Sequence, residues 1–586
     1  MISLQQTELT LAEALTLAIR DAGVSHVFGV SGANIESFHD ALFRLAQHDI
    51  TSLLCKSERG ASFMADGFAR QSGTLAVCCS TSGGGMMNLA VGLAEARNSG
   101  IPVLAIIGCP PSGLAGRGAF QDGSGGRDRI DAELLWQAVA KYSTTVTPAK
   151  FWLQLQQAIK ATREGFKGPA VLLIPSDFLN APVTARPAFF AAETSIGGGT
   201  VPAHQLYQLE LALRRSRHPL LIAGPAVSGN RELQHFSFTS GIPVATTMES
   251  TAAFPHHHPR FMGVLGVAGH RNVHDYLRTC DLVVSLGSQL EIMTRGAAQE
   301  ALDSIPIHIY HTSTASAPVS NLIRLCECDP NSVILGLRQT LVQFRSAPLS
   351  QPARAPTRRR LPATSREDGM TTTEALQLLQ PFVPHFNQFL FDAGNCAAAA
   401  AHLLALPDHA RSHIALGMGG MGYAIAAAIG MRLSQPEGAT LVICGDGAFL
   451  MEGLEIHTAI ELKLKILYLV FNDSQHGMCV SRQRHFFDDR IFCTTYSTVN
   501  FTELTRGLAG ENACYCAQVT DARSLHACLD EYLSQDEAMP GVIELMITQE
   551  ELPAFFPLNS DIVTQRSSRL TQSEDELPLI PEQGLR

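Results

Sequence analysis

The chain has 586 residues, of which 46% are hydrophobic and 17% are charged, and its mean hydropathy is +0.09. This amount of apolar material supports a large folded core and excludes a mainly disordered chain. With 43 basic and 54 acidic side chains the formal net charge is −11, which argues against general binding to nucleic acids. The length predicts three or four domains.

The fourteen cysteines are scattered and form no Cys-x-x-Cys pair. This spacing argues against a disulfide framework or a zinc ribbon, and with the absence of an apolar leader it predicts a cytoplasmic protein. Residues 414–431 are apolar and about long enough to span a membrane. Because the stretch begins with a glycine cluster, which weakens a helix, we interpret it as a glycine turn before a buried helix.

Helix and strand patterns alternate along residues 1–185, which we assign to an N-terminal domain. Helices are predicted at Leu11–Asp21, at Ser57–Ala69 and, after a glycine turn at residues 82–85, at Met87–Ala96. Apolar strands are predicted at His26–Phe28, Leu75–Cys79, Pro102–Gly108 and Ala170–Pro175. Alternation of this kind predicts a parallel sheet covered by helices on both faces.

Two further units repeat the pattern. The central domain, 200–340, has a predicted helix at His204–Ser216 and strands at Pro219–Ala223, Pro243–Thr247, Asp281–Leu286 and Ile305–Tyr310. The C-terminal domain, 370–550, has predicted strands at Phe389–Asp392, Thr440–Cys444, Lys465–Phe471 and Gly541–Met546. The fold class is therefore α/β, with three doubly wound parallel-sheet domains.

The remaining segments differ in composition. Residues 341–369 are rich in proline, serine and arginine, which is typical of an exposed linker. The arginine triplet at 358–360 leaves a basic nucleic-acid arm as the alternative. Residues 551–586 are polar and proline-containing, and we expect them to form a tail.

The strongest motif lies in the C-terminal domain. A strand ends at the turn Gly445-Asp446-Gly447, a helix is expected near Met451, and the next strand ends at Asn472 after 24 intervening residues. This is the length of one crossover, so Asp446 and Asn472 are predicted at the carboxyl ends of neighbouring parallel strands, where ligands bind. Their oxygen atoms suit Mg²⁺, and the glycines let a phosphate approach the helix N-terminus. An ordinary turn capped by Asp446 is the alternative.

With this motif the sequence resembles the thiamine diphosphate (ThDP) enzymes. Further segments are similar to that family in the expected order: KSERGASFMADGFAR, STSGGGMMNLAVGLAEARNSGIPVLAIIG, GAFQD and LGMGGMGYAIAAAIGM. The resemblance covers about residues 8 to 550, and Phe120-Gln121 favours the acetolactate synthase branch. It implies a fold of pyrimidine-binding, central and diphosphate-binding domains.

The resemblance also implies site residues. Asp446, Asn472 and the carbonyl of Ser474 correspond to the Mg²⁺ ligands. Cofactor contacts correspond to Glu58, Asn395, Met421, Gly445, Gly447, Ala448 and Ser474. The implied catalytic roles are those of Glu58 at the aminopyrimidine ring and Gln121 at the acceptor, and His476, which stands where the family often has a tyrosine, is a further candidate as an acid–base group. A solvated helix charge, a turn glutamine and a packed loop histidine are the respective structural alternatives.

The implied activity is that of an acetolactate synthase-like carboligase. It would decarboxylate pyruvate or a related 2-oxo acid and join the product to a second carbonyl, in a homodimer or homotetramer with sites at the subunit interface. The alternatives are a non-ligating 2-oxo-acid decarboxylase and a non-catalytic partner subunit.

Some positions depart from the branch. The acceptor-selecting tryptophan is missing, and Arg482 and Arg484 stand in that region, either as carboxylate ligands or as solvated side chains. Residues 288–291 and 310–312 differ from the FAD-binding segments of relatives, so FAD is not expected. Neither a nucleic acid nor a membrane is an expected partner.

Overall fold

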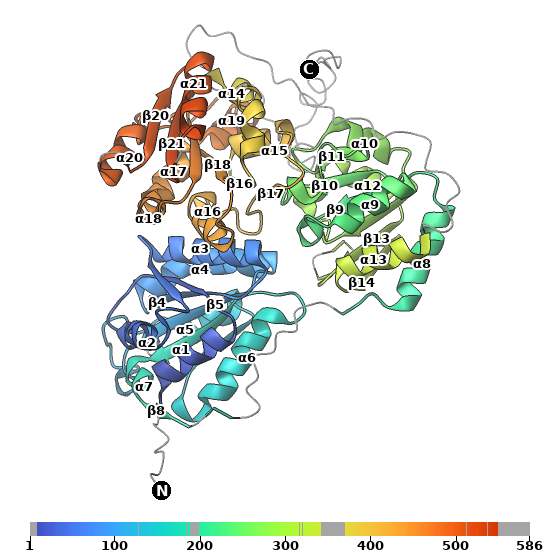
Figure 1. Ribbon diagram of the computed structural model, residues 1–586. Helices are drawn as coiled ribbons and strands as arrows, with labels where there is room; N and C mark the ends of the chain where they lie inside the picture. The colour runs from blue at the N-terminus through green and yellow to red at the C-terminus, as the bar shows by residue number, and fades with distance from the viewer. Residues whose placement is uncertain are drawn as a thin grey trace. The chain divides into compact units, whose positions relative to one another are not determined.

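The computed structural model describes residues 9–126, 128–184, 186–187, 199–315, 317–318, 320, 322–341, 370–510, 513–535 and 537–548. The predicted tail and almost all of the predicted linker lie outside these residues. The chain forms three main sheets flanked by helices, which confirms the predicted α/β class (Figure 1). The domain boundaries remain predictions.

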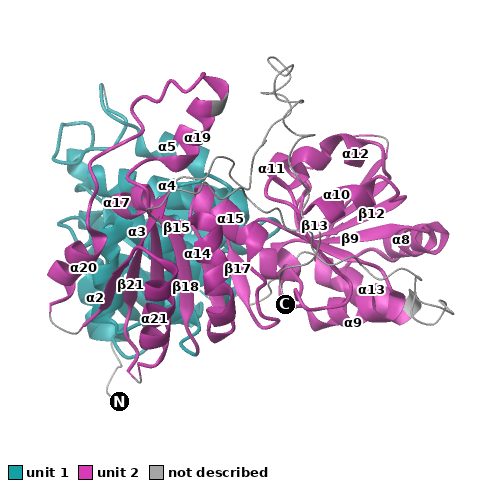
Figure 2. Cartoon of the chain, turned by 90° about the horizontal axis from the view of Figure 1, so that it is seen from above, with its two compact units in different colours: residues 1–197, 415–437, 452–466 teal, residues 198–414, 438–451, 467–586 magenta. Residues whose placement is uncertain are grey.

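By its contacts the chain divides into two compact units (Figure 2). The first contains Met1–Gly197, Ala415–Glu437 and Glu452–Ile466, and the second contains Gly198–Ile414, Gly438–Met451 and Leu467–Arg586. Two segments from the C-terminal third of the sequence thus belong to the same unit as the N-terminal sheet.

The N-terminal sheet is fully parallel, with strand order β3-β2-β4-β5-β7-β6. Its strands are β2 (His26–Gly29), β3 (Thr51–Leu54), β4 (Ala76–Thr81), β5 (Val103–Cys109), β6 (Tyr142–Thr145) and β7 (Ala170–Pro175). Its helices are α1 (Leu11–Asp21), α2 (Glu36–Ala46), α3 (Glu58–Ser72), α4 (Gly84–Ser99), α5 (Ala132–Val139), α6 (Phe151–Arg163) and α7 (Ser176–Leu179). A separate antiparallel pair joins β1 (Leu9–Thr10) to β8 (Pro182–Val183).

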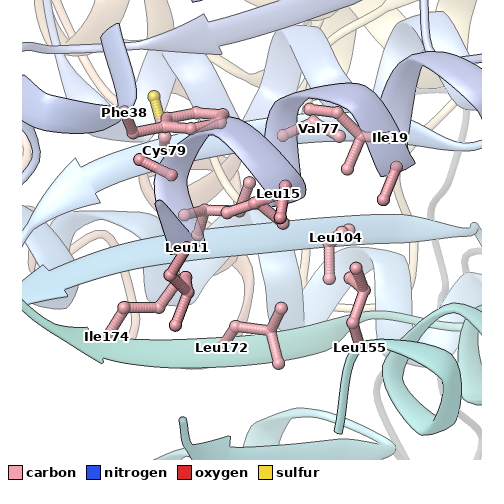
Figure 3. Close-up of a cluster of buried hydrophobic side chains, with 14 of the residues drawn as sticks. Leu11, Leu15, Ile19, Phe38, Val77, Cys79, Leu104, Leu155, Leu172 and Ile174 are labelled. Carbon is pink, nitrogen blue, oxygen red and sulfur yellow. The ribbon is translucent and has the colours of Figure 1, made fainter. Parts of the chain in front are cut away.

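Helix α1 shows why these residues fold as they do. Thr10 and Glu13 form a reciprocal capping box at its start. Apolar side chains at helical spacing, Leu11, Leu15 and Ile19, are fully buried against the sheet (Figure 3). The predicted bounds of α1 are confirmed, whereas α4 begins at Gly84, so the glycine turn before it is shorter than predicted.

The apolar stretch at 414–431 contributes helix α16 (Tyr423–Ser434), which packs against α3. Glycines permit this contact, because an added Cβ at Gly67 would overlap the carbonyl of Ala427 and one at Gly430 would overlap the carbonyl of Met64. No helix within the described ranges is long and apolar enough to cross a membrane. The interpretation of this stretch as a core helix is confirmed.

The central sheet is also parallel, in the order β11-β10-β9-β12-β13-β14. Its strands are β9 (Pro219–Ala223), β10 (Val244–Thr247), β11 (Phe261–Leu265), β12 (Leu282–Leu286), β13 (Ile307–His311) and β14 (Ile323–Glu327). Its helices are α8 (Ala203–Arg215), α9 (Arg231–Ser240), α10 (Arg271–Leu277), α11 (Ile292–Arg295), α12 (Gln299–Asp303) and α13 (Pro330–Leu341). Two apolar clusters contain alternating residues of these strands, as expected for a sheet buried on both faces.

The C-terminal sheet has the order β15-β21-β19-β18-β16-β17, and β20 also pairs with β21. Its strands are β15 (Met370–Thr371), β16 (Gln388–Phe391), β17 (Arg411–His413), β18 (Thr440–Gly445), β19 (Ile466–Asn472), β20 (Tyr515–Val519) and β21 (Gly541–Thr548). The helices are α14 (Thr372–Leu379), α15 (Asn395–Leu403), α17 (Asp446–Glu452), α18 (Ile456–Glu461), α19 (Gly477–Phe486), α20 (Phe501–Ala509) and α21 (Ala522–Leu533).

One predicted boundary in this sheet is wrong. Helix α17 begins at Asp446, directly after β18, and not near Met451. The Asp446 carboxylate accepts a hydrogen bond from the N–H of Gly447 in the first turn, so the Gly-Asp-Gly segment itself starts the helix.

Candidate active site

Strands β18 and β19 are neighbours and end at the predicted metal residues. Asp446 follows β18, and its Oδ2 atom accepts a hydrogen bond of 3.3 Å from the N–H of Gln475, in the loop after Asn472. Asp446 and Asn472 are 2% and 1% exposed. The structure therefore brings the two residues to the same edge of the sheet, as their spacing predicted.

The side-chain amide of Asn472 has a fixed orientation. Its Nδ2 atom donates to the carbonyl of Val499 at 3.0 Å and to Oε1 of Glu544 at 2.6 Å. Its Oδ1 atom accepts from the N–H of Ser474 at 3.1 Å, and Ser474 has a left-handed backbone with φ of 57°. The amide nitrogen is thus committed to the protein interior, which leaves Oδ1 as the only atom of the side chain suited to a metal.

These residues fit a magnesium–diphosphate group. Asp446, Asn472 and the Ser474 carbonyl offer one carboxylate and two neutral oxygen atoms, the hard ligands that Mg²⁺ prefers. Among the described residues no cluster of three or more His, Cys, Asp or Glu could hold a metal, so a site built from acids and imidazoles has no counterpart there. A Cβ added at Gly445 would meet no atom within 4 Å, which leaves backbone open to a phosphate.

Asn395, the first residue of α15, lies beside the same loop. A Cβ added at Gly477 would lie 3.5 Å from its Nδ2 atom and 2.9 Å from Oδ2 of Asp473. Nδ2 donates to Ser481 at 3.3 Å, while Oδ1 is buried and has no hydrogen-bond partner among the described residues. An unsatisfied buried polar atom at this place is consistent with a ligand-binding role.

His476 begins the turn into α19. Its backbone N–H donates to the carbonyl of Thr494 at 2.8 Å, and its half-buried ring lies edge-on to Tyr496, with centroids 5.7 Å apart. On the same helix, Arg484 forms a 3.7 Å ion pair with Asp489. Arg482 and Arg484 are the two arginines predicted as possible carboxylate ligands. Arg484 already pairs with a carboxylate of the protein.

Glu58 is the first residue of α3, in the first unit. Ser57 caps the helix by accepting from the N–H of Gly60 at 2.8 Å, and the helix dipole favours a negative charge at this end. The Oε2 atom of Glu58 accepts from Asn88 at 2.9 Å. A Cβ on Gly85 would lie 3.0 Å from Oε1, which accepts no hydrogen bond from the described residues. One carboxylate oxygen is thus held and the other is available.

Gln121 lies at the other end of the glycine turn formed by residues 83–85, beside Gly83. Its Oε1 atom accepts from Asn34 at 3.2 Å and from the hydroxyl of Thr81 at 2.9 Å, and its carbonyl accepts from Ser82 at 3.1 Å. Its backbone is left-handed, with φ of 64°, and a Cβ on Gly83 would lie only 2.8 Å from its Cγ. With Oε1 occupied, the Nε2 amide is the group free to donate.

Two buried carboxylates that sequence reasoning missed hold the segment before α3. The Oε1 atom of Glu455 accepts from the N–H groups of Lys56 at 2.8 Å and Ser57 at 2.7 Å. Glu452 accepts from the Ser57 hydroxyl at 2.8 Å and pairs with Arg59 at 2.5 Å. Burial raises the pKa of Glu455 to about 7, against the opposing effect of the Ser57 N–H. No local signal points to these contacts, because the partners are about 400 residues apart in sequence.

The predicted residues therefore fall into two groups. Glu58 and Gln121 flank one glycine turn of the first unit. The same unit also contains the half-buried Met421, two residues before the start of α16. The second group belongs to the second unit: Asn395, Gly445, Asp446, Gly447, Ala448, Asn472, Ser474 and His476.

Comparison with known proteins finds matches along most of the chain. Models of the thiamine pyrophosphate enzymes match residues 9–128 (N-terminal TPP binding domain), 208–321 (central domain) and 392–545 (C-terminal TPP binding domain). The acetolactate synthase isozyme 2 large subunit of Escherichia coli is 27% identical over 93% of this chain and 97% of its own length. The probable acetolactate synthase large subunit of Methanocaldococcus jannaschii is 26% identical over 98% and 94%.

The fold has a solved counterpart. The ThDP-dependent 4-hydroxybenzoylformate decarboxylase of Rhodococcus jostii RHA1 superposes with a TM-score of 0.78 at 19% identity, covering 93% of this chain and all of that one. Three matched domains in order, a shared fold and relatives over nearly the whole length show that the chain belongs to the ThDP-dependent enzymes, in the acetolactate synthase-like family.

Proposed function

We propose that the protein is a ThDP- and Mg²⁺-dependent carboligase that decarboxylates a 2-oxo acid, such as pyruvate, and joins its acyl unit to a second carbonyl compound. The observation that carries this proposal is the placement of Glu58 and Gln121 at the two ends of one glycine turn. A ligating site needs a carboxylate that contacts the cofactor and, close to it, an amide that donates to the second substrate.

In this proposal Asp446, Asn472 and the Ser474 carbonyl hold Mg²⁺. The backbone N–H groups of Gly447 and Ala448 at the start of α17 would hold the diphosphate, together with Asn395. Bound ThDP supplies a thiazolium carbon that acts as nucleophile and electron sink.

Glu58 would accept a hydrogen bond from the aminopyrimidine ring through Oε1, the oxygen that accepts none from the described residues. Asn88 restrains the other oxygen, so the carboxylate is oriented before the cofactor binds. Its role would be to hold a proton at Oε1 and to exchange it with that ring.

Gln121 donates from Nε2 to the acceptor carbonyl, because Asn34 and Thr81 already occupy its Oε1 atom. Met421 would contact the bound cofactor. His476, half-buried in the metal loop, serves as an acid–base group.

The test is to incubate the purified protein with ThDP, Mg²⁺ and pyruvate and to identify the products by mass spectrometry. Release of CO₂ together with acetolactate or another acyloin is the expected result. Acetaldehyde as the only organic product would favour a non-ligating decarboxylase. Absence of turnover with every 2-oxo acid, aldehyde and thioester in a crossed screen would leave a non-catalytic subunit.

We further propose a cytoplasmic homodimer or homotetramer with active sites shared between subunits. All fourteen cysteines are free thiols, which supports a reducing compartment. Size-exclusion chromatography with light scattering measures the oligomeric state.

A further inference from the structure

A buried carboxylate that no part of the proposed reaction uses lies behind the metal loop. Glu544 is in the middle of β21, the strand next to β19, and it is 0% exposed. Its Oε1 atom accepts from Nδ2 of Asn472 at 2.6 Å. Its Oε2 atom accepts from the N–H and hydroxyl of Thr502, at 3.2 and 3.0 Å, and from Gln518 at 3.3 Å.

This arrangement requires a carboxylate. Both oxygens of Glu544 face hydrogen-bond donors, so a glutamine in its place would turn its NH₂ group toward a donor on one side or the other. Burying an anion without a cationic partner is costly, and no salt bridge to Glu544 occurs in the described part of the chain. A divalent cation held by the neighbouring loop would offset part of that cost.

The carboxylate also decides which atom of Asn472 is available. If the amide turned over, Oδ1 would face two acceptors, Oε1 of Glu544 and the carbonyl of Val499. Donation to an anion also polarises the amide and makes Oδ1 more negative. Outer partners of this kind orient metal ligands and raise their basicity.

We infer that Glu544 is a positioning residue that fixes the Asn472 amide and thereby sets the affinity of the site for a divalent cation. The inference rests on the metal assignment of the proposed function, and it extends that assignment to a residue 72 positions away in sequence.

The experiment measures binding of Mn²⁺ to the full-length protein in the presence of ThDP, by electron paramagnetic resonance. For Glu544→Gln we expect Mn²⁺ binding about 10- to 100-fold weaker than wild type. Thr502→Val is the matched control, because it removes a donor to the other oxygen and leaves the Asn472 contact in place. It should keep wild-type Mn²⁺ affinity. Thermal unfolding without metal or cofactor shows that each variant is folded.

A rescue variant separates positioning from a merely structural role. Asn472→Asp places two carboxylates against each other and should lose most Mn²⁺ binding. In the double variant with Glu544→Gln, the new glutamine can donate its NH₂ group to the new aspartate. The glutamine oxygen still accepts from Thr502 and Gln518. The double variant should bind Mn²⁺ more tightly than Asn472→Asp alone, although the Val499 carbonyl keeps the recovery partial.

Wild-type Mn²⁺ affinity in Glu544→Gln, or a double variant no better than Asn472→Asp, would overturn the inference. If the wild type shows no ThDP-dependent Mn²⁺ binding, the metal assignment falls and the inference falls with it. If Mn²⁺ binding behaves as expected but no carboligation occurs, only the proposed reaction is wrong.

Discussion

At the scale of single residues, Glu58 combines a restrained oxygen with an available one. Asn88 holds Oε2, and the start of α3 stabilises the negative charge. The role that we propose for Glu58, as a proton partner, depends on ionisation and not on shape, so a neutral isostere tests it directly.

Glu58→Gln should bind ThDP and Mg²⁺ but lower kcat by about 10²- to 10⁴-fold. Turnover assays and cofactor titration on the same sample measure the two effects. Glu36→Gln is the matched control, because Glu36 is also the first residue of a helix but is exposed. Unchanged turnover in Glu58→Gln would remove Glu58 from the mechanism.

Glu455 provides a pH-dependent test of the segment that precedes Glu58. Burial raises its pKa from 4.5 to about 7, so folding favours the protonated carboxyl. The stability it contributes is fully present below pH 4.5 and is lost as the pH rises to about 7.

Glu455→Gln is permanently neutral, and its oxygen still accepts from the Lys56 and Ser57 N–H groups. The free energy of unfolding of this variant, relative to wild type, should rise between pH 4.5 and 7 by at most about 3 kcal/mol. Above pH 7 the difference between the two proteins should stay constant. Chemical denaturation across this pH range measures it. Glu461→Gln, an exposed control, should show no such gain, and a pH-independent difference for Glu455→Gln would contradict the assignment.

At the scale of elements, the contact between α3 and α16 depends on backbone approaching backbone. Gly67 faces the carbonyl of Ala427, and a Cβ added there would lie 2.2 Å from the carbonyl oxygen. Next to this contact, Tyr423 of α16 donates to Asp66, which also pairs with Arg70 at 2.8 Å. These contacts hold the second half of α3 against α16.

Gly67→Ala should destabilise the protein by about 1–3 kcal/mol through overpacking, although alanine is the better helix former. Gly507→Ala is the control of opposite sign, because Gly507 lies inside α20 with no atom within 4 Å of an added Cβ. It should stabilise by about 1 kcal/mol. Denaturant unfolding compares the two, and equal effects would show that the α3–α16 contact tolerates a side chain.

The strands differ in how well the sequence predicts them. The buried strands β4, β5, β7 and β9 are continuous apolar runs, and they were predicted within one or two residues. The strands β3, β6, β14 and β20 were missed, because they are short and polar or partly exposed, and their pairing comes from the neighbouring strand. The buried strand β11 was missed as well.

At the scale of the whole molecule, the proposed shared active sites give a complementation test. Glu58→Gln and Asp446→Ala chains should each be inactive as homodimers. In a hybrid dimer, one site would combine the intact Glu58 of one chain with the intact Asp446 of the other.

Co-expression of the two chains should restore about a quarter of wild-type activity, since half of randomly formed dimers are hybrids with one intact site each. Differently tagged chains allow the hybrid to be purified and assayed. A hybrid as inactive as its parents would place each active site within a single chain.

The sequence by itself determined the α/β class, the order of three sheets and the juxtaposition of Asp446 with Asn472. Apolar runs and the length of one crossover are local properties of the chain, and strand ends then follow from the geometry of parallel sheets. Only the tertiary structure decided that Glu544 holds Asn472, that Glu455 holds the segment before Glu58, and that Asn34 and Thr81 orient Gln121. These contacts join residues tens to hundreds of positions apart, and buried polar groups find such partners through the packing of the whole fold and not through any pattern in the sequence.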